Sequence, residues 1–266
     1  MNRRNYGDSL VNLVGLQKQL LPKNPATPAL VGCQSWEVQI GINLAKTGEI
    51  QDGINRLKRA LTMEEGITLN DKIFLNSEIA YWYGELRDVE NALKHLYIAK
   101  DLGRDDAWLN SQIGWNLLEE DVKEALKYLN KAKDLGKDDA WINRQFGFAY
   151  SQLGEYEKAI SSFKKARELG ANDSWLLYQL GLALKEYGNI EEAINIFKEE
   201  IEITDYKGFG DLQLAWCYAL IDEKEKAKEY FKNVDKYLSS SLKNDEELRK
   251  DYNTVKELIN STTYIN

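Results

Sequence analysis

LGKDDAWINRQFGFAYSQLGEYEKA, residues 135–159, is the stretch of this sequence that decides its fold. Parts of it occur twice more, as LGRDDAW at 102–108 and as LGANDSW at 169–175. The tryptophans that close the three phrases are 33 and 34 residues apart. A phrase that returns at a constant interval of this size indicates an array of similar structural units.

Two further landmarks keep the same interval. Alanines recur in steps of 33, 34, 34 and 34 residues, at Ala92, Ala125, Ala159, Ala193 and Ala227. Small residues also recur, at Gly41, Ala80, Gly114, Gly147, Gly181 and Ala215. Three landmarks with one period predict a repeat protein over most of the chain.

Each unit has the pattern of two helices joined by a turn. Apolar residues recur at steps of three and four over 142–153 and again over 156–166, as in amphipathic helices. Gly154 predicts a tight turn between these helices, and Gly170 predicts the end of the second one. The aspartates of the repeated phrase predict N-terminal caps, at Asp106, Asp139 and Asp173. The phrase therefore marks where one helix ends and the next begins.

Small residues predict where the two helices of a unit cross. Gly147 and Ala159 are expected at the closest approach, because a larger side chain there would push the helices apart. Phe163 and Tyr150 are expected to fill the space beside that crossing.

In this order the features resemble the tetratricopeptide repeat. The family's order of large apolar residue, Gly or Ala, Tyr, turn Gly, Tyr, Ala, Phe and Ala is met by Phe146, Gly147, Tyr150, Gly154, Tyr156, Ala159, Phe163 and Ala166. The next unit matches at Leu180, Gly181, Leu184, Gly188, Ile190, Ala193 and Phe197. The family's junction proline is absent, and the LG-x-D-D cap stands in its place.

The resemblance implies an all-α fold, a right-handed α-solenoid of about six helical hairpins. We assign these repeats to residues 34–240, with units at about 34–66, 71–104, 105–137, 138–171, 172–205 and 206–240. Terminal units of a solenoid often diverge because they cap the array.

Both ends of the chain lack the repeat. Residues 1–33 are predicted to form a leader: an amphipathic helix over 9–21, then a linker with the chain's three prolines, Pro22, Pro25 and Pro28. The leader either packs on the first repeat as a cap or serves as a detachable segment for dimerisation or partner docking. Residues 241–266 are predicted to form a C-terminal capping helix, over 243–262, and a tail.

Composition restricts the partners. The net charge of −8 argues against nucleic acid and against anionic lipid, and no apolar run approaches the roughly 20 residues that cross a bilayer. Cys33 and Cys217 fit no metal spacing and read as two free thiols, with Cys217 buried, in a reducing compartment. A cytoplasmic protein is expected.

Signals for catalysis are weak throughout. His95 is the only histidine, and on its helix beside Lys94 it is expected to face solvent. There is no phosphate-binding glycine loop, nucleophile elbow or Cys–His metal spacing. We therefore predict no enzyme activity, no catalytic residue, no metal and no cofactor.

The resemblance implies that the first helix of each unit lines the concave surface of the superhelix. Side chains seven residues apart share a helix face, and such pairs hold large apolar residues. These pairs are Phe74 and Tyr81, Trp108 and Trp115, Trp141 and Phe148, Trp175 and Leu182, Phe209 and Trp216. Between the members of each pair, or at the equivalent place, a polar residue recurs, at Gln39, Glu78, Gln112, Gln145, Gln179 and Gln213.

A carboxamide donates and accepts hydrogen bonds at once, so a ladder of glutamines could hold a peptide main chain. Aromatic walls would add apolar contact. The competing interpretation is structural: the tryptophans of the repeated phrase pack between units, and the glutamines bond neighbouring helices. The predicted peptide-binding residues are Gln39, Glu78, Tyr81, Trp108, Gln112, Trp115, Trp141, Arg144, Gln145, Phe148, Trp175, Tyr178, Gln179, Gln213 and Trp216.

Chaperone-binding members of the family clamp an acidic chain end with several cations. The corresponding positions here hold Val38, Ser77, Ser111, Arg144, Tyr178 and Leu212, so that specificity is disfavoured. The predicted function is a scaffold that receives a protein or peptide partner, either an extended peptide or a helix, in the groove. Two alternatives are a peptide-sensing regulator and a self-assembling structural protein that forms homo-oligomers through its leader or terminal repeats.

Overall fold

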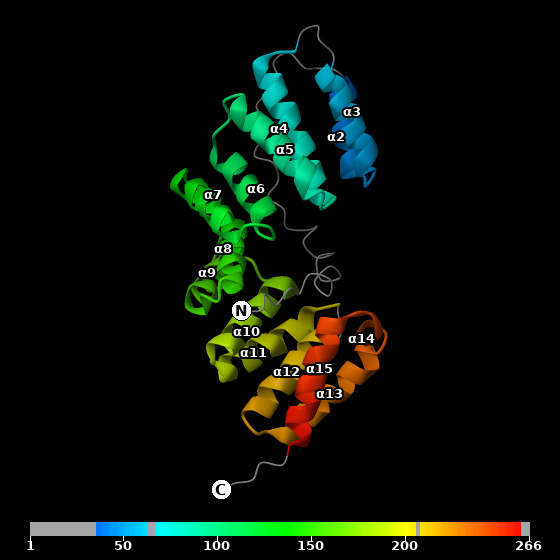
Figure 1. Cartoon of the computed structure of the whole chain (residues 1–266), viewed down its shortest axis with the longest axis vertical. Helices are drawn as coiled ribbons and strands as arrows, with labels where there is room; N and C mark the ends of the chain where they lie inside the picture. Colours follow the sequence, from blue (N-terminus) through cyan, green and yellow to red (C-terminus); the bar gives the residue numbers. More distant parts are fainter. Residues whose placement is uncertain (1–35, 63–66, 206–207, 262–266) are drawn as a thin grey trace. The chain divides into compact units, whose positions relative to one another are not determined.

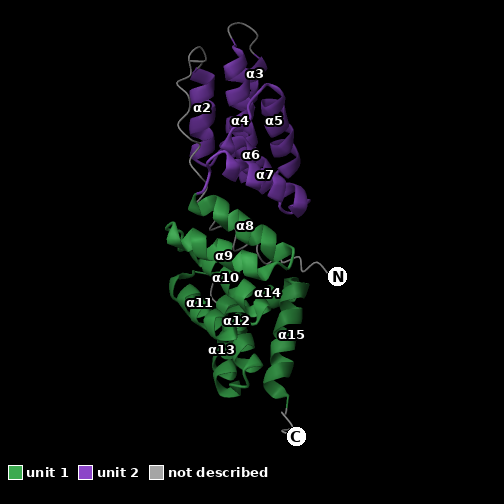
Figure 2. Cartoon of the chain, turned by 90° about the vertical axis from the view of Figure 1, so that its left-hand side faces the viewer, with its two compact units in different colours: residues 1–21, 139–266 green, residues 22–138 purple. Residues whose placement is uncertain are grey.

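The computed structural model describes residues 36–62, 67–205 and 208–261, and within these ranges the only regular secondary structure is helical. The predicted all-α fold is therefore confirmed, whereas the leader helix lies outside the described residues. The chain divides after Asp138 into two compact units, whose described parts we call the N-terminal unit (36–138) and the C-terminal unit (139–261) (Figures 1 and 2).

The N-terminal unit is a stack of three antiparallel hairpins. Each helix packs against its hairpin partner, and each second helix also packs against the first helix that follows it. The helices are α2 (Trp36–Lys46), α3 (Ile50–Thr62), α4 (Leu69–Glu85), α5 (Val89–Asp101), α6 (Ala107–Leu117) and α7 (Val122–Asp134).

The C-terminal unit repeats this arrangement and adds two helices at its end. Its hairpin helices are α8 (Ala140–Gln152), α9 (Tyr156–Glu168), α10 (Ser174–Tyr187), α11 (Ile190–Ile203), α12 (Phe209–Leu220) and α13 (Lys224–Leu238). The short α14 (Ser241–Asn244) leads into α15 (Glu246–Asn260), which packs against α12 and α13. Leu248, Val255 and Ile259 of α15 are buried in that contact.

The repeated phrase folds as its chemistry predicts. The carboxylates of Asp106, Asp139 and Asp173 accept hydrogen bonds from the third backbone N–H of α6, α8 and α10, at 2.8, 2.9 and 3.1 Å. Gly170 adopts a positive φ of 96° just after α9, a conformation that costs glycine little. Each copy of the phrase is therefore a helix stop followed by a helix start.

The small residues of the first helices allow their aromatic neighbours to lie close. A Cβ added to Gly147 would fall 2.5 Å from the ring of Phe163, and one added to Gly181 would fall 2.6 Å from Phe197. Both distances are impossible for a real side chain, so glycine is required for the rings to pack where they do.

First and second helices differ in how much of their surface is covered. In α6 and α10 nearly every residue is buried, because each first helix packs on its partner and on neighbouring hairpins. In α7 and α9 only one stripe is buried, such as Ala159, Ile160, Phe163 and Ala166. The first helices thus form the core of each unit. Among the described residues no helix is both long enough and apolar enough to span a bilayer.

Candidate binding surface on the first helices

The first helices α4 and α6 lie in a definite register in the N-terminal unit. Near the start of α6, the Arg104 guanidinium stacks 4.3 Å from the ring centre of Trp108 and donates a 2.6 Å hydrogen bond from Nη1 to Ser77 Oγ. Near its end, the Trp115 ring lies on Gly84, whose Cβ would fall 2.8 Å from Trp115 Cζ3. Ser77 and Trp108 are 31 positions apart, as are Gly84 and Trp115, so a residue of α4 faces the residue 31 positions later.

The same offset occurs within the C-terminal unit. The Arg144 guanidinium of α8 lies 4.5 Å from the ring centre of Trp175 in α10. The Lys185 ammonium of α10 lies 3.7 Å from the ring centre of Trp216 in α12. Both pairs are 31 residues apart, so one register describes successive first helices in each unit.

This register determines what faces each glutamine. Within the N-terminal unit it places Gln112 opposite Tyr81. Within the C-terminal unit it places Gln179 opposite Phe148 and Gln213 opposite Leu182. Each of these glutamines therefore lies opposite the second member of the pair of large apolar residues on the preceding first helix.

The polar ladder is buried, with one exception. Glu78, Gln112, Gln145, Gln179 and Gln213 are buried, whereas Gln39 is exposed. Gln213 is engaged within the chain, because its Oε1 accepts a 2.7 Å hydrogen bond from Lys185 and its Nε2 points at the Tyr178 hydroxyl, 3.5 Å away. The Nε2 groups of Gln112 and Gln179 are buried without a hydrogen-bond acceptor.

The aromatic residues divide into two groups. Trp108, Trp141 and Trp175 at the helix starts are buried, and Trp175 contacts Phe148 and Phe163 at ring-centre distances of 5.9 and 6.4 Å. The later members, Tyr81, Trp115, Phe148 and Trp216, keep part of their surface exposed. Tyr178 is buried edge-on against Phe197.

Two tetratricopeptide repeat family models match the chain, over residues 138–205 and 211–237. These two stretches, residues 138–205 and 211–237, are tetratricopeptide repeats. A comparison with curated protein sequences found no match to this chain.

Solved structures of tetratricopeptide repeat proteins share this fold at low identity. YrrB, described as a TPR protein with an unusual peptide-binding site, is 20% identical, with a TM-score of 0.56 over 73% of this chain and 96% of YrrB. MamA of Desulfovibrio magneticus RS-1 is 20% identical, with a TM-score of 0.59 over 65% of this chain and 98% of that one. PilF of Pseudomonas aeruginosa is 15% identical, with a TM-score of 0.64 over 83% and 95%.

A cation links successive hairpins in each unit. It stacks on the tryptophan at the start of the later first helix and pairs with the aspartate that caps that helix. In the N-terminal unit this cation is Arg104, whose Nε lies 2.9 Å from Asp106 Oδ2. In the C-terminal unit it is Arg144, whose Nη1 lies 3.3 Å from Asp173 Oδ2. Burial lowers the pKa of Arg144, and Asp173 opposes that shift.

Sequence reasoning missed Arg104 and Lys185 as parts of this surface. The signal for Arg104 is that the repeated phrase has a basic residue before its aspartates at 104 and 137 but Ala171 in the third copy. Arg144 supplies the missing cation from α8, the first helix of the preceding hairpin. Lys185 has no signal beyond its spacing of 31 residues from Trp216.

His95 corrects one expectation. It was predicted to face solvent, but it is only 7% exposed, because it points from α5 toward α4. Its Nδ1 lies 2.8 Å from Asn76 Oδ1, and its ring stacks on Tyr83. Burial, then Lys58 and Lys94, lower the pKa of His95 to about 4. Cys217 is a buried free thiol, as predicted, and burial raises its pKa to about 11.

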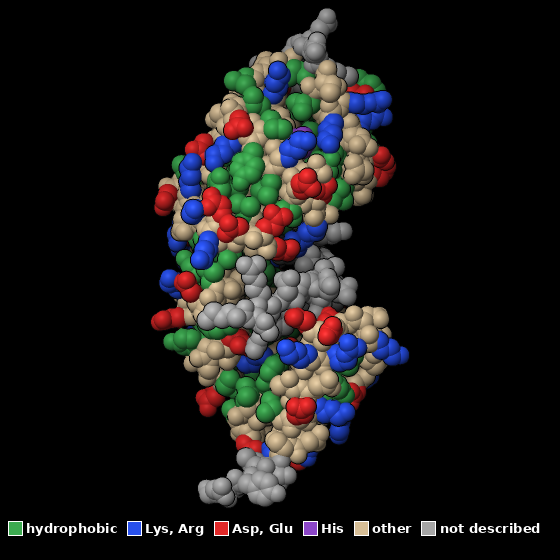
Figure 3. Space-filling model, in the orientation of Figure 1, with side chains coloured by type: hydrophobic (Ala, Val, Ile, Leu, Met, Phe, Trp, Pro, Cys, Tyr) green, Lys and Arg blue, Asp and Glu red, His purple; other side chains and the backbone are tan. Residues whose placement is uncertain are grey.

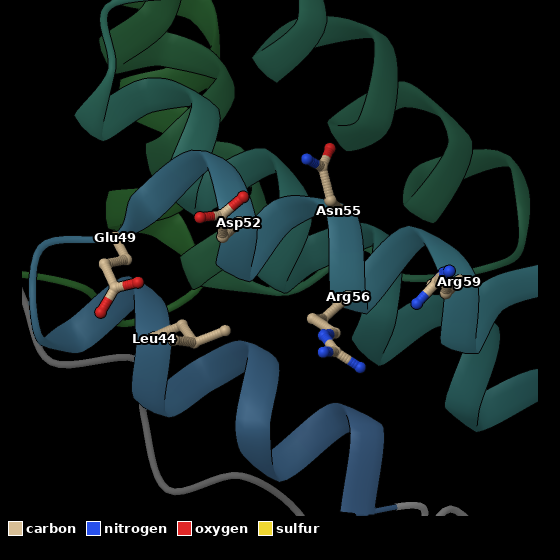
Figure 4. Close-up of a pocket in the computed structure, with 6 residues that line it drawn as sticks. All are labelled: Leu44, Glu49, Asp52, Asn55, Arg56 and Arg59. Carbon is tan, nitrogen blue, oxygen red and sulfur yellow. The ribbon is translucent and has the colours of Figure 1, made fainter.

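A shallow hollow of about 390 Å³ lies on the first hairpin (Figure 4). It is lined by Leu44, Glu49, Asp52, Asn55, Arg56 and Arg59, and Arg56 is already held by both carboxylate oxygens of Glu37 at 3.0 and 2.8 Å. Charged residues of both signs are dispersed over the visible surface of each unit (Figure 3). The described residues contain no group of three or more His, Cys, Asp or Glu able to hold a metal ion.

Proposed function

We propose that the chain is a cytoplasmic, non-enzymatic scaffold whose first-helix faces bind a peptide or a partner helix. The observation that carries the proposal is the pair of buried carboxamides, Gln112 and Gln179, whose N–H donors lack an acceptor in the chain. Leaving a buried donor unpaired costs about 1–3 kcal/mol of stability. Such a cost at equivalent positions of two repeats is explained if a ligand supplies the acceptor.

A peptide has the chemistry that these positions require. Its main-chain carbonyls accept hydrogen bonds at regular intervals without regard to side-chain identity. The register places the half-buried rings of Tyr81 and Phe148 opposite Gln112 and Gln179, where they offer apolar contact to the peptide's side chains. The peptide-binding site named for YrrB is consistent with this use of the fold.

The test uses variants that separate folding from binding. A random dodecapeptide display library is selected on the immobilised full chain, and the enriched peptides are measured by fluorescence polarisation. Gln112→Leu and Gln179→Leu each remove an unpaired buried donor, so we expect unchanged or raised stability together with binding weakened by about tenfold. Trp115→Ala combined with Trp216→Ala should weaken binding further while the far-ultraviolet circular dichroism persists.

Gln152→Leu is the matched control, because Gln152 is exposed at the end of α8. It should leave peptide affinity unchanged. Enrichment of no peptide, or affinities that ignore both glutamine substitutions, would refute the proposal.

A further inference from the structure

One face of α2, at the edge of the N-terminal unit, is apolar and open (Figure 2). Trp36, Gln39, Ile40 and Asn43 lie three, four and seven residues along the helix, so they share this surface, which we call the α2 face. Trp36 is 67% exposed, more than any other large hydrophobic side chain of the described residues. Gln39 and Asn43 are exposed, and Ile40 is half-buried. The face therefore combines an exposed indole with neutral side chains only.

The equivalent surface is covered on later first helices. Counted from the small residue at the helix crossing, Trp36 corresponds to Leu75 in α4, Leu109 in α6 and Leu176 in α10. Each of these leucines is 0% exposed, and the residues equivalent to Ile40 and Asn43 are buried in the same three helices. The second helix of the preceding hairpin packs on each of these first helices. Among the described residues no helix precedes α2, so its face is the one place in this stack where such a helix is lacking.

The α2 face is unlike the outer surface of a finished solenoid end. Terminal units usually present a polar outer face to water, because nothing packs beyond them. An indole that is two-thirds exposed on an uncharged surface instead suits the apolar side of another helix.

The leader predicted from the sequence has the pattern and the reach to fill this place. Over residues 9–21 an apolar stripe recurs at helical spacing, at Leu10, Leu13, Val14, Leu20 and Leu21. The 14 residues from 22 to 35 can span about 46 Å at full extension, whereas α2 is about 16 Å long. A tether of this length gives the leader an effective concentration on the order of millimolar at its own α2. That concentration favours the chain's own leader over a second copy.

We propose that residues 9–21 form a helix that packs on the α2 face of the same chain and takes the place of the missing hairpin helix. Its apolar stripe covers Trp36 and Ile40. Of the two uses that the sequence leaves open for the leader, this one is the cap on the first repeat. The inference is independent of the proposed peptide-binding function.

Disulfide trapping in the full chain tests the contact. In a Cys33→Ser background, where Cys217 is buried, Gln17→Cys is paired either with Gln39→Cys or with Asn43→Cys. These substitutions replace polar side chains, and a disulfide forms only when the two Cα atoms come within about 7 Å. We expect mild oxidation to join at least one pair within a single chain, seen as a faster-migrating monomer on a non-reducing gel.

Two matched pairs are the controls. Gln19→Cys with Gln39→Cys uses the opposite side of the leader helix, and Gln17→Cys with Gln51→Cys uses an exposed position on α3. Both should form a disulfide about ten times more slowly than the faster test pair. Equal rates for test and control pairs would show that the leader is a free tether and would overturn the proposal. Failure of both test pairs would overturn it too, and disulfides between chains would assign the α2 face to a second copy instead.

A second measurement uses no engineered cysteine. Deleting residues 1–30 should lower the urea midpoint of the N-terminal unit, followed through the resonance of His95, the only histidine. In a Trp36→Ala background the same deletion should have much less effect, because the main contact is already lost. An unchanged midpoint after deletion, or an equal loss in both backgrounds, would contradict packing of the leader on Trp36.

Discussion

Gly84 shows how one absent side chain positions an aromatic ring of the binding surface. Alanine within a helix is usually about 1 kcal/mol more stable than glycine. At position 84 its Cβ would fall 2.8 Å from Trp115 Cζ3. We therefore expect Gly84→Ala to lower the free energy of unfolding by about 1–2 kcal/mol and to weaken peptide binding, both through displacement of the indole.

Urea unfolding of the single and double variants checks this prediction. In a Trp115→Ala background the clash is gone, so Gly84→Ala should then be neutral or stabilising. An equal loss of stability in both backgrounds would show that the indole is not the cause.

His95 provides a titration that can be assigned without ambiguity, because it is the chain's only histidine. Its pKa is lowered to about 4 from an ordinary 6.5. Between these values the unfolded chain binds a proton that the folded chain does not. The free energy of unfolding should therefore fall as pH drops from 6.5 toward 4, by about 2–3 kcal/mol from this residue.

The imidazole proton resonance in NMR measures this pKa directly. We expect a midpoint near 4 in the native protein and near 6.5 in urea. Asn76→Ala, which removes the contact to Nδ1, is the comparison variant. A native midpoint near 6.5 would mean that the ring is solvated.

At the scale of elements, the cation between hairpins holds successive first helices in register. The Arg144 side chain is 4% exposed and that of Asp173 is 18% exposed, so this pair is poorly screened by solvent. Arg144→Met leaves the Asp173 carboxylate without its cation and should cost about 3 kcal/mol in urea unfolding.

Arg167→Met is the matched control for this prediction, because Arg167 pairs with Glu199 on α11 at a more exposed place. It should cost less than about 1 kcal/mol. Equal costs for the two variants would show that Arg144 does no more than an ordinary surface ion pair.

A feature can be predicted from the sequence when residues adjacent in the chain determine it, and is harder to predict when it depends on contacts between different helices. The caps at Asp106, Asp139 and Asp173 and the crossing at Gly147 were predictable, because neighbouring residues determine them. His95 was predicted wrongly, because its burial depends on Asn76 in the other helix of the hairpin. The unpaired state of Gln112 could not be predicted, since it depends on which side chains of α4 and α6 face one another.

For the whole molecule, nearest-neighbour packing predicts that damage at one end stays local, because each hairpin contacts only its neighbours. Removing residues 245–266 deletes α15 and uncovers α12 and α13. In a Cys33→Ser background, the buried Cys217 thiol on α12 then reports the C-terminal unit, and His95 reports the N-terminal unit. We expect the Cys217 thiol to become labelled at a lower urea concentration in the truncated chain, whereas the urea midpoint reported by the His95 resonance should not change.

Removing residues 262–266 alone is the control and should shift neither probe. Loss of both probes at one lowered midpoint would instead mean that the two units unfold as a single cooperative body.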